Sequence, residues 1–392
     1  MTEKTAAKIM GRPRWIKITA WVLAVIALLI ILLGMYWSRA PKVFWVNEFV
    51  DNDRVVVGFA TTDTLVRVAE TLLDKPGGYL TNDKLPPGLY LDNIPNWEKG
   101  VLTQVKDLSR VIRNDYSRSQ SQSKEDEDAV VATEKFFSES NSWIFPPTEQ
   151  RFREGIEAMT RYRDRLTGNA EPEAQFFSRA DNLREWLAEV EKRLGSLTRR
   201  LGDSVTTTRI NENLAFDPSA EAAQSQPDSV RVRTSWFEVD DVFFEARGSA
   251  WALLHFLRAA EFDFARVLAD KNAEASVRQI IRELEASIAP LRSPMILNGG
   301  GYGLFANHSL VLANYLARAN AAVINLRELL DRDRYCSGIL PRFPVNAAQP
   351  PTSAYLFVRC SLRSLNASQT STPESSGFLN DLADSRPPER IR

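Results

Sequence analysis

The side chains best suited to metal chemistry are two histidines. His255 and His308 are the only histidines in the chain, and neither belongs to a His-Glu-x-x-His or Glu-x-x-His arrangement. Such arrangements place two ligands on one helical face and are typical of zinc and di-iron sites. We therefore interpret both histidines as ordinary buried or surface residues.

Three carboxylates have a spacing that could bind a hard cation. Glu238, Asp241 and Glu245 stand at i, i+3 and i+7, so a helix would place them on one face, where their oxygens could hold a metal ion. A structural interpretation competes, because Ser235 and Glu238 have the spacing of a capping box and acids in a first turn favour the helix dipole. We favour the structural interpretation and predict no metal site.

A glycine-rich stretch at residues 298–303 formally matches a dinucleotide fingerprint. The match runs from Gly301 through Gly303 to Ala306, but no strand-helix-strand unit surrounds it and no Gly-Lys-Ser or Gly-Lys-Thr follows. We predict a turn that lets the chain reverse, or lets another backbone approach closely, and no cofactor. An anion at the following helix N-terminus is the alternative.

Serine chemistry and wall-lytic chemistry find little support in the sequence. The chain has no Gly-x-Ser-x-Gly elbow, and Glu139-Ser140 lacks the neighbouring pattern expected around a wall-lytic glutamate. We therefore predict no catalytic residue.

One apolar stretch determines where any such chemistry would take place. Residues 18–37 make roughly 30 Å of helix, which matches the hydrocarbon thickness of a bilayer. Residues 1–17 carry five basic side chains against one acid, so the positive-inside rule keeps the N-terminus in the cytoplasm and exports the rest to the periplasm. A cleaved signal peptide is disfavoured, because the stretch is longer than a usual h-region and Pro41 follows the only small-residue site.

Composition narrows the class of partner. The chain has 49 basic and 50 acidic residues, interspersed without a basic face, so we expect no nucleic acid partner. Cys336 and Cys360 both fall on the exported side, where a disulfide can form. Two free thiols are the alternative, because sequence cannot give the geometry of the pair.

Apolar periodicity predicts a mainly α-helical protein: one transmembrane helix followed by a large antiparallel helical bundle. Residues 61–74 read as a helix after a short strand at Val55 to Val57 in the juxtamembrane segment 38–60. Heptad-like seams follow, in which apolar residues alternate at spacings of four and three. One seam comprises Leu183, Leu187, Val190, Leu194, Leu197 and Leu201, and another comprises Leu312, Leu316, Ala319, Val323, Leu326 and Leu330.

These patterns divide the exported part into segments. We predict a first helical half at 61–202, a polar linker or excursion at 203–233, and a second helical half at 234–335, whose small residues allow close helix approach. Residues 336–392 are predicted to be loop and a disordered tail, because proline, serine, asparagine and alanine dominate there.

A long loop at residues 77–97 carries aromatic side chains among prolines and glycines. Long loops of this type are often functional. From this loop through the Arg-Asn-Asp-Tyr-Ser-Arg-Ser-Gln-Ser-Gln-Ser run that ends at Ser123, the chain resembles an uncharacterised bacterial family of membrane-anchored domains. The resemblance extends to about Arg334. It implies a bacterial membrane setting and no known activity, cofactor or catalytic residue.

The sequence thus favours a non-enzymatic inner-membrane protein whose periplasmic body is a scaffold or adaptor. Its partner would be another envelope protein, or a second copy bound through the helical seams. A ligand-sensing module that works through a partner is the alternative, and a cell-wall hydrolase is less favoured. We predict that the interaction surface includes Tyr79, Asn96, Trp97, Tyr302 and His308.

Overall fold

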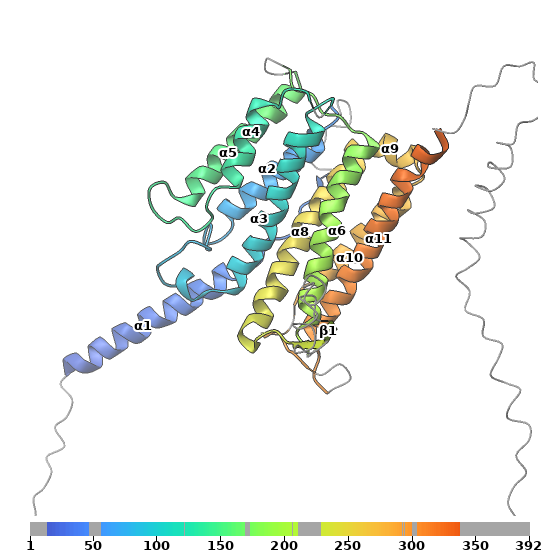
Figure 1. The fold of residues 1–392 in the computed structure, drawn as a ribbon. Helices are drawn as coiled ribbons and strands as arrows, with labels where there is room; N and C mark the ends of the chain where they lie inside the picture. The colour runs from blue at the N-terminus through green and yellow to red at the C-terminus, as the bar shows by residue number, and fades with distance from the viewer. Residues whose placement is uncertain are drawn as a thin grey trace, which may run out of the picture. The chain divides into compact units, whose positions relative to one another are not determined.

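The computed structural model describes residues 14–46, 56–120, 122–168, 173–205, 207–210, 229–291, 293, 295–299 and 304–337. Within these residues the chain is almost entirely helical, which confirms the predicted fold class (Figure 1). The first helix is α1 (Arg14–Trp37). Its residues Lys17–Trp37 have a mean hydropathy of 2.8 and form the one helix of the described part that is long and apolar enough to cross a membrane.

The helices that follow α1 make up what we call the helical body. They include the π-helical turn η3 and the 3-10 turns η2 and η5. Their bounds are α2 (Phe59–Asp74), η2 (Gly88–Tyr90), α3 (Asn93–Val111), η3 (Ile112–Tyr116), α4 (Glu127–Phe136), α5 (Thr148–Leu166), α6 (Ala180–Gly202), η5 (Trp236–Glu238), α8 (Val239–Asp263), α9 (Ala265–Asp270), α10 (Glu274–Ser287) and α11 (His308–Ser337).

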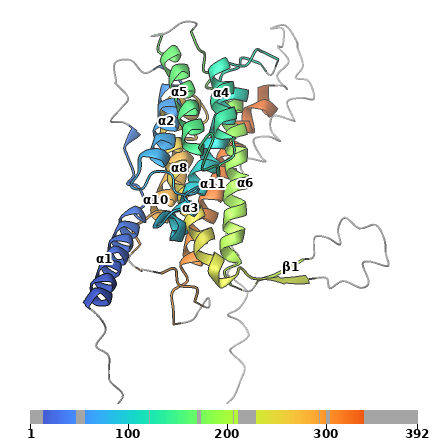
Figure 2. The same ribbon diagram turned by 90° about the vertical axis from the view of Figure 1, so that its left-hand side faces the viewer.

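Successive long helices run in opposite directions, so the helical body has two ends (Figure 2). At one end, α2, α4, α6 and α10 finish and α3, α5, α8 and α11 begin. The last turn of α1 lies here, since a Cβ placed on Gly34 would be 3.5 Å from Pro87 Cβ. We call this the anchor end, and we call the opposite end the far end. At the far end, Gly58 N–H donates to Asp263 at 2.8 Å and joins the start of α2 to the end of α8.

One continuous hydrophobic core joins residues from α2 to α11, and so from both predicted halves. The seam side chains are part of it: Leu187 and Leu194 on α6 and Leu316 and Leu326 on α11 are fully buried. The seams therefore already pack inside one chain, which leaves them unavailable to a second copy in this conformation. The division at residues 203–233 stays a prediction.

The closest helix contact is between α3 and α8, where the small-residue prediction applies. A Cβ on Gly248 would lie 2.0 Å from Trp97 O, and one on Gly100 would lie 2.1 Å from Glu245 O. Only glycine allows the two backbones to approach so closely. Ser249 adds a hydroxyl that donates to Gly100 O at 3.2 Å.

Several local predictions need correction. Val56 and Val57 form no strand and lead into a turn before α2, while Val55 lies outside the described residues. Ser235 makes no capping bond, because a 3-10 turn follows it and α8 starts only at Val239. Asp92 caps Asn93 N–H at 2.8 Å, so α3 begins inside the segment predicted to be an irregular loop.

The predicted linker contains the only two strands among the described residues. β1 (Thr207–Ile210) pairs antiparallel with β2 (Ser229–Val232), with Thr207 opposite Val232. The residues between them lie outside the described part. Helices α4 and α10 were not among the predicted elements, although α10 carries Val277, Ile280 and Leu284 at helical spacing.

Candidate functional site

Two residues of the predicted interaction surface lie in the hydrophobic core. Tyr79 and Trp97 are each 2% exposed. The Tyr79 ring packs against Phe152 at 5.5 Å, and its hydroxyl donates to Ser140 O at 3.1 Å. Trp97 packs against Trp251 at 5.2 Å. Their side chains hold the anchor end together and are unavailable to a partner in this conformation.

The other predicted surface residues gather near the start of α8. Asn96 donates to Asp241 Oδ1 at 2.7 Å. His308 accepts the Leu297 N–H at 2.9 Å, and its ring lies 6.4 Å from that of Phe243. Tyr302 lies outside the described residues. Asn96 and His308, one from each of the two segments, thus both contact the first turns of α8.

A buried ion pair fixes the 77–97 segment. Lys75 pairs with Glu98, and their side chains are 1% and 0% exposed. Glu98 also accepts N–H bonds from Leu80 at 2.9 Å and from Thr81 at 2.8 Å. These bonds satisfy the buried carboxylate and hold the chain after α2 in place. The proline-rich and glycine-rich segment is therefore ordered by one charge pair that periodicity cannot reveal.

The acidic face of α8 is used in ion pairing. Glu245 accepts from Arg200 at 2.7 and 3.0 Å and from Lys99 at 2.9 Å, so it links α8 to α6 and α3. Burial raises its pKa, but the bonds to these two cations outweigh burial and the pKa is lowered. Burial, followed by the charge of Asp240, raises the pKa of Asp241. Among the described residues, no group of three or more histidine, cysteine or acidic side chains could hold a metal ion.

His255 has a structural role. Its ring stacks on Phe44 with centroids 4.0 Å apart, Nδ1 lies 2.7 Å from Trp251 O, and Nε2 accepts the Phe44 N–H at 3.1 Å. Burial lowers its pKa to about 4. The ring is thus neutral at pH 7 with its proton on Nδ1, and it clamps the segment after α1 onto α8.

The predicted disulfide remains a prediction. Cys336 belongs to the last turn of α11, and Cys360 lies outside the described residues.

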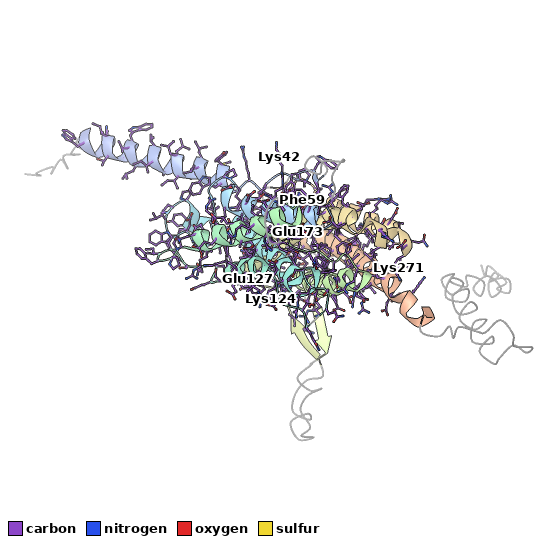
Figure 3. All side chains as sticks on the ribbon, turned by 90° about the horizontal axis from the view of Figure 1, so that it is seen from above. Lys42, Phe59, Lys124, Glu127, Glu173 and Lys271 are labelled. Carbon is purple, nitrogen blue, oxygen red and sulfur yellow. The ribbon has the colours of Figure 1, made fainter. Side chains whose placement is uncertain are left out.

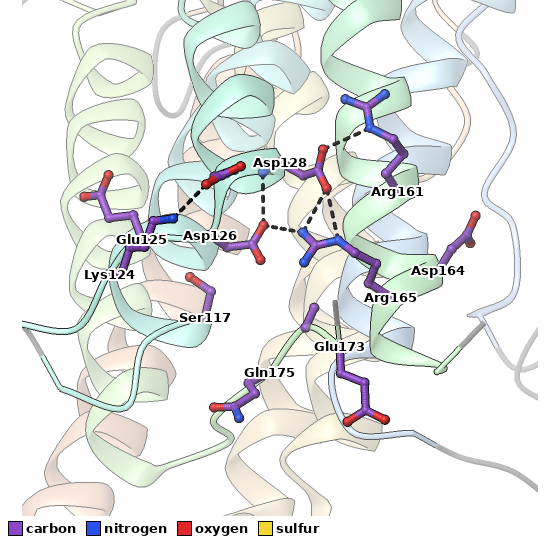
Figure 4. A pocket seen from close by; sticks show the side chains of 12 residues that line it. Ser117, Lys124, Glu125, Asp126, Asp128, Arg161, Asp164, Arg165, Glu173 and Gln175 are labelled. Carbon is purple, nitrogen blue, oxygen red and sulfur yellow. Dashed lines mark hydrogen bonds and ion pairs between the residues drawn. The ribbon is translucent and has the colours of Figure 1, made fainter. Parts of the chain in front are cut away.

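A charged cavity of about 550 Å³ lies at the far end, where sequence analysis predicted no site (Figure 4). The α3–α4 connection, the start of α4, the end of α5 and the segment before α6 contribute to it. Nine of its twelve lining residues are charged: Lys124, Glu125, Asp126, Glu127, Asp128, Arg161, Asp164, Arg165 and Glu173, with Ser117, Ala174 and Gln175 completing the wall.

An ion-pair network forms the cavity wall between α4 and α5. Arg165 donates to Asp126 at 2.6 Å and to Asp128 at 3.1 Å, and Arg161 donates to Asp128 at 2.9 Å. Burial alone would lower the pKa of Arg165, but its bonds to the two aspartates outweigh burial and the pKa is raised. The guanidinium therefore stays charged. Asp126 also caps α4 by accepting from Ala129 N–H at 3.2 Å. The network gives the cavity a rigid, charged wall.

Comparison with known protein families gives one match. Residues 10–333 match a family described as an uncharacterized protein conserved in bacteria (DUF2333). The chain belongs to this family. The match covers α1 and nearly all of the helical body, including both ends, and brings no known activity with it. Neither the curated proteins nor the solved structures contain a match to the chain.

The two regions differ in what they can do chemically. At the anchor end, the buried charges are already paired and serve to hold segments together. At the far end, charged side chains surround an open volume that another molecule can enter. The acidic run at residues 125–128 and the i, i+4 pair of Arg161 and Arg165 were visible in the sequence, but no local pattern joins α4 to α5.

Proposed function

We propose that this DUF2333 protein is a non-enzymatic, membrane-anchored adaptor of the bacterial cell envelope. In this proposal α1 spans the inner membrane, the N-terminus is cytoplasmic, and the helical body is periplasmic. The length and hydropathy of Lys17–Trp37 support the span. The excess of basic residues before it supports the orientation, and the bacterial family supports the setting.

The observation that carries the adaptor role is the charged cavity at the far end. Sites for small molecules are mostly apolar, with a few polar groups that fix orientation. Here nine of the twelve lining residues are charged, which fits a charged segment of another macromolecule better. A ligand-sensing module is therefore the second candidate.

The charge of the cavity indicates the kind of partner. Six carboxylates and three cationic side chains line it, so it is acidic overall. Glu173 is an exposed residue of the lining (Figure 3), and Figure 4 shows it on the other side of Arg165 from Asp126 and Asp128. Complementary charge across an interface gives specificity and fast association. We infer a partner that presents lysine or arginine side chains.

The cavity fits a hydrolase less well. A glycosidase-type general acid is a carboxyl whose pKa is raised so that it holds a proton at working pH. Asp126 and Asp128 instead accept hydrogen bonds from Arg165, at 2.6 Å for Asp126 and 3.1 Å for Asp128, so their oxygens are already engaged by a neighbouring guanidinium. They act as structural anions in the wall.

Site-specific photo-crosslinking of the full chain in living bacteria tests the proposal. A photoreactive residue at Glu173 is expected to give an adduct of defined mass, and one at the exposed Glu328 on α11 serves as the control. Co-expressed unlabelled wild-type protein should compete for the partner and reduce the amount of adduct. A co-expressed unlabelled Glu173→Lys variant should not reduce it. If positions 173 and 328 give the same adducts, or none, the far-end cavity is not a partner site.

A further inference from the structure

Exposed apolar side chains gather on four segments of the anchor end. These segments are the α2–α3 loop, the α4–α5 loop, the turn η5, and the loop before α11. Each presents at least one large side chain to solvent in this structure, and their exposed fractions are far above those of core residues. The exposed fractions are 75% for Tyr90, 94% for Phe145, 85% for Phe237 and 72% for Phe305. We call these four residues the apolar tips.

Hydrogen bonds tie the α2–α3 loop to the α4–α5 loop and hold the other two segments beside neighbouring helix ends. Asn82 Nδ2 donates to Ser142 O at 2.9 Å and joins the α2–α3 and α4–α5 loops. The bond from Asn96 to Asp241 joins the start of α3 to the start of α8, which follows η5 directly. Asn298 Nδ2 donates to Ser204 O at 2.6 Å and joins the loop before α11 to the end of α6. The tips are therefore held around the same end of the helical body.

The far end has a different surface. Among the described residues of the far-end connections at 112–126, 167–179 and 264–273, no large apolar side chain is exposed. Val57, just before α2, and Trp45, whose ring lies 4.6 Å from the Arg258 guanidinium near the end of α8, are the exceptions at that end. Charged residues occupy this end instead, including those of the cavity. Single exposed apolar residues scattered over a surface are normal. The concentration of large exposed apolar side chains at the anchor end needs a physical reason.

The anchor end also touches the apolar helix α1. A Cβ on Gly34 would lie 3.5 Å from Pro87 Cβ and 3.7 Å from Leu91 Cδ2. Tyr90 lies between Pro87 and Leu91 in sequence, so the first apolar tip is adjacent to the part of α1 that is apolar enough to cross a membrane. A bilayer that holds α1 would begin at the level of this loop.

We propose that the anchor end is a membrane-contact surface whose apolar tips enter the interfacial region of the bilayer that holds α1. Aromatic side chains favour this region, because their rings leave water while their edges stay near headgroups. One apolar span and several shallow insertions give a body held at more than one point. The inference rests on the span proposed for α1 and is independent of the partner proposed for the far-end cavity.

Charge does not drive this contact. Charges of both signs lie at the anchor end, with Asp92, Glu238 and Asp240 on one side of the balance and Arg39, Lys84 and Arg233 on the other, so anionic lipids have no particular advantage there. The contact should therefore form on zwitterionic lipid and persist when salt is raised, because apolar burial is not screened.

Lipid quenching of a site-specific fluorophore tests the proposal. The full chain, with Cys336→Ser and Cys360→Ser, is placed at one copy per nanodisc of zwitterionic lipid that includes a nitroxide-labelled lipid. The fluorophore is attached through Asn141→Cys or Ser235→Cys, two exposed positions near the tips, and Glu127→Cys at the far end is the control. One copy per disc excludes a second copy, and the purified system excludes other proteins.

We expect labels at 141 and 235 to be quenched several-fold more strongly than the label at 127, at low and high salt. Equal quenching at the three positions would overturn the proposal. The proposal would also be overturned if the labels at 141 and 235 became shielded from solvent only when two copies share a disc. That outcome would assign the surface to a second copy.

A paired substitution sharpens the test. In the double variant Phe145→Ser and Phe237→Ser, two large apolar side chains no longer leave water. The ratio of molecules whose anchor end contacts lipid to molecules whose anchor end does not should therefore fall by about tenfold or more. Both side chains are exposed, so thermal unfolding of the body should not change. Unchanged quenching at 141 and 235 in this variant would show that the tips do not hold the body on lipid.

Discussion

The glycine crossing of α3 and α8 makes a quantitative prediction for Gly248→Ala. The new Cβ would lie 2.0 Å from Trp97 O, whereas a carbon needs about 3.3 Å from a carbonyl oxygen, so the helices must separate by roughly 1.3 Å. That shift loosens the packing of Trp97 on Trp251 in a fully buried contact. We expect a loss of about 3 kcal/mol in the free energy of unfolding, at the upper end of the usual overpacking cost.

Gly195→Ala on α6 is the matched control. Its Cβ would meet only Asn320 Nδ2, at 3.8 Å, which is ordinary contact. Alanine costs less conformational entropy than glycine in a helix, so this substitution should stabilise by about 0.5 to 1 kcal/mol. The same glycine-to-alanine substitution should therefore lower the free energy of unfolding at position 248 and raise it at position 195.

Urea unfolding of the full chain in mild detergent, followed by the helical circular dichroism signal, measures both effects. Adding Gly100→Ala to Gly248→Ala should cost less than the sum of the single substitutions, because one separation relieves both contacts. The reasoning is refuted if Gly248→Ala unfolds at the same urea concentration as the wild type, or if both alanines shift the midpoint in the same direction.

Two further substitutions test the buried charges. Glu98→Gln leaves Lys75 buried without a carboxylate and should cost about 3 kcal/mol in urea unfolding, while Glu98→Gln with Lys75→Met should recover part of it, because no buried cation remains and the amide oxygen still accepts from Leu80 N–H; equal stability of all three would contradict the ion-pair account. His255, with a pKa lowered to about 4 in the folded state against an ordinary value of 6.5, binds a proton more readily when unfolded. Its contribution is therefore complete above pH 6.5 and is lost as pH falls from 6.5 toward 4, by up to about 3 kcal/mol. His255→Gln should show a flatter dependence of stability on pH, and an equally steep one would exclude this histidine as the cause.

Most of the helices could be predicted from the local periodicity of apolar residues. The α6 and α11 seams were predictable because their apolar side chains repeat every three or four residues, and each such side chain is buried in one core. The same rule places residues on a face without saying which element covers it. It therefore could not show that Leu194 and Leu316 pack within one chain instead of between two copies.

The functional regions depended on contacts between distant residues. Aromatic residues among prolines and glycines predicted a functional loop with Tyr79 and Trp97 on an interaction surface, yet both side chains lie in the core beside the buried Lys75–Glu98 pair. The far-end cavity depends on Arg165 meeting Asp126 across 39 positions of sequence. Charged residues look alike in sequence whether they face solvent or surround a cavity, so no spacing rule could have located it.

The clamp of Phe44 on His255 limits how far the helical body can rise above a membrane. Six residues lie between Trp37 at the end of α1 and Phe44, and a fully extended chain from one to the other reaches roughly 25 Å. His255 lies eight residues before the end of α8, which adds roughly 12 Å along the bundle. If α1 spans a bilayer as proposed, the clamp therefore keeps the far end within roughly 40 Å of the bilayer surface. A partner anchored in the same membrane can reach the charged cavity with a short arm, whereas one fixed farther away in the envelope must extend a segment toward it.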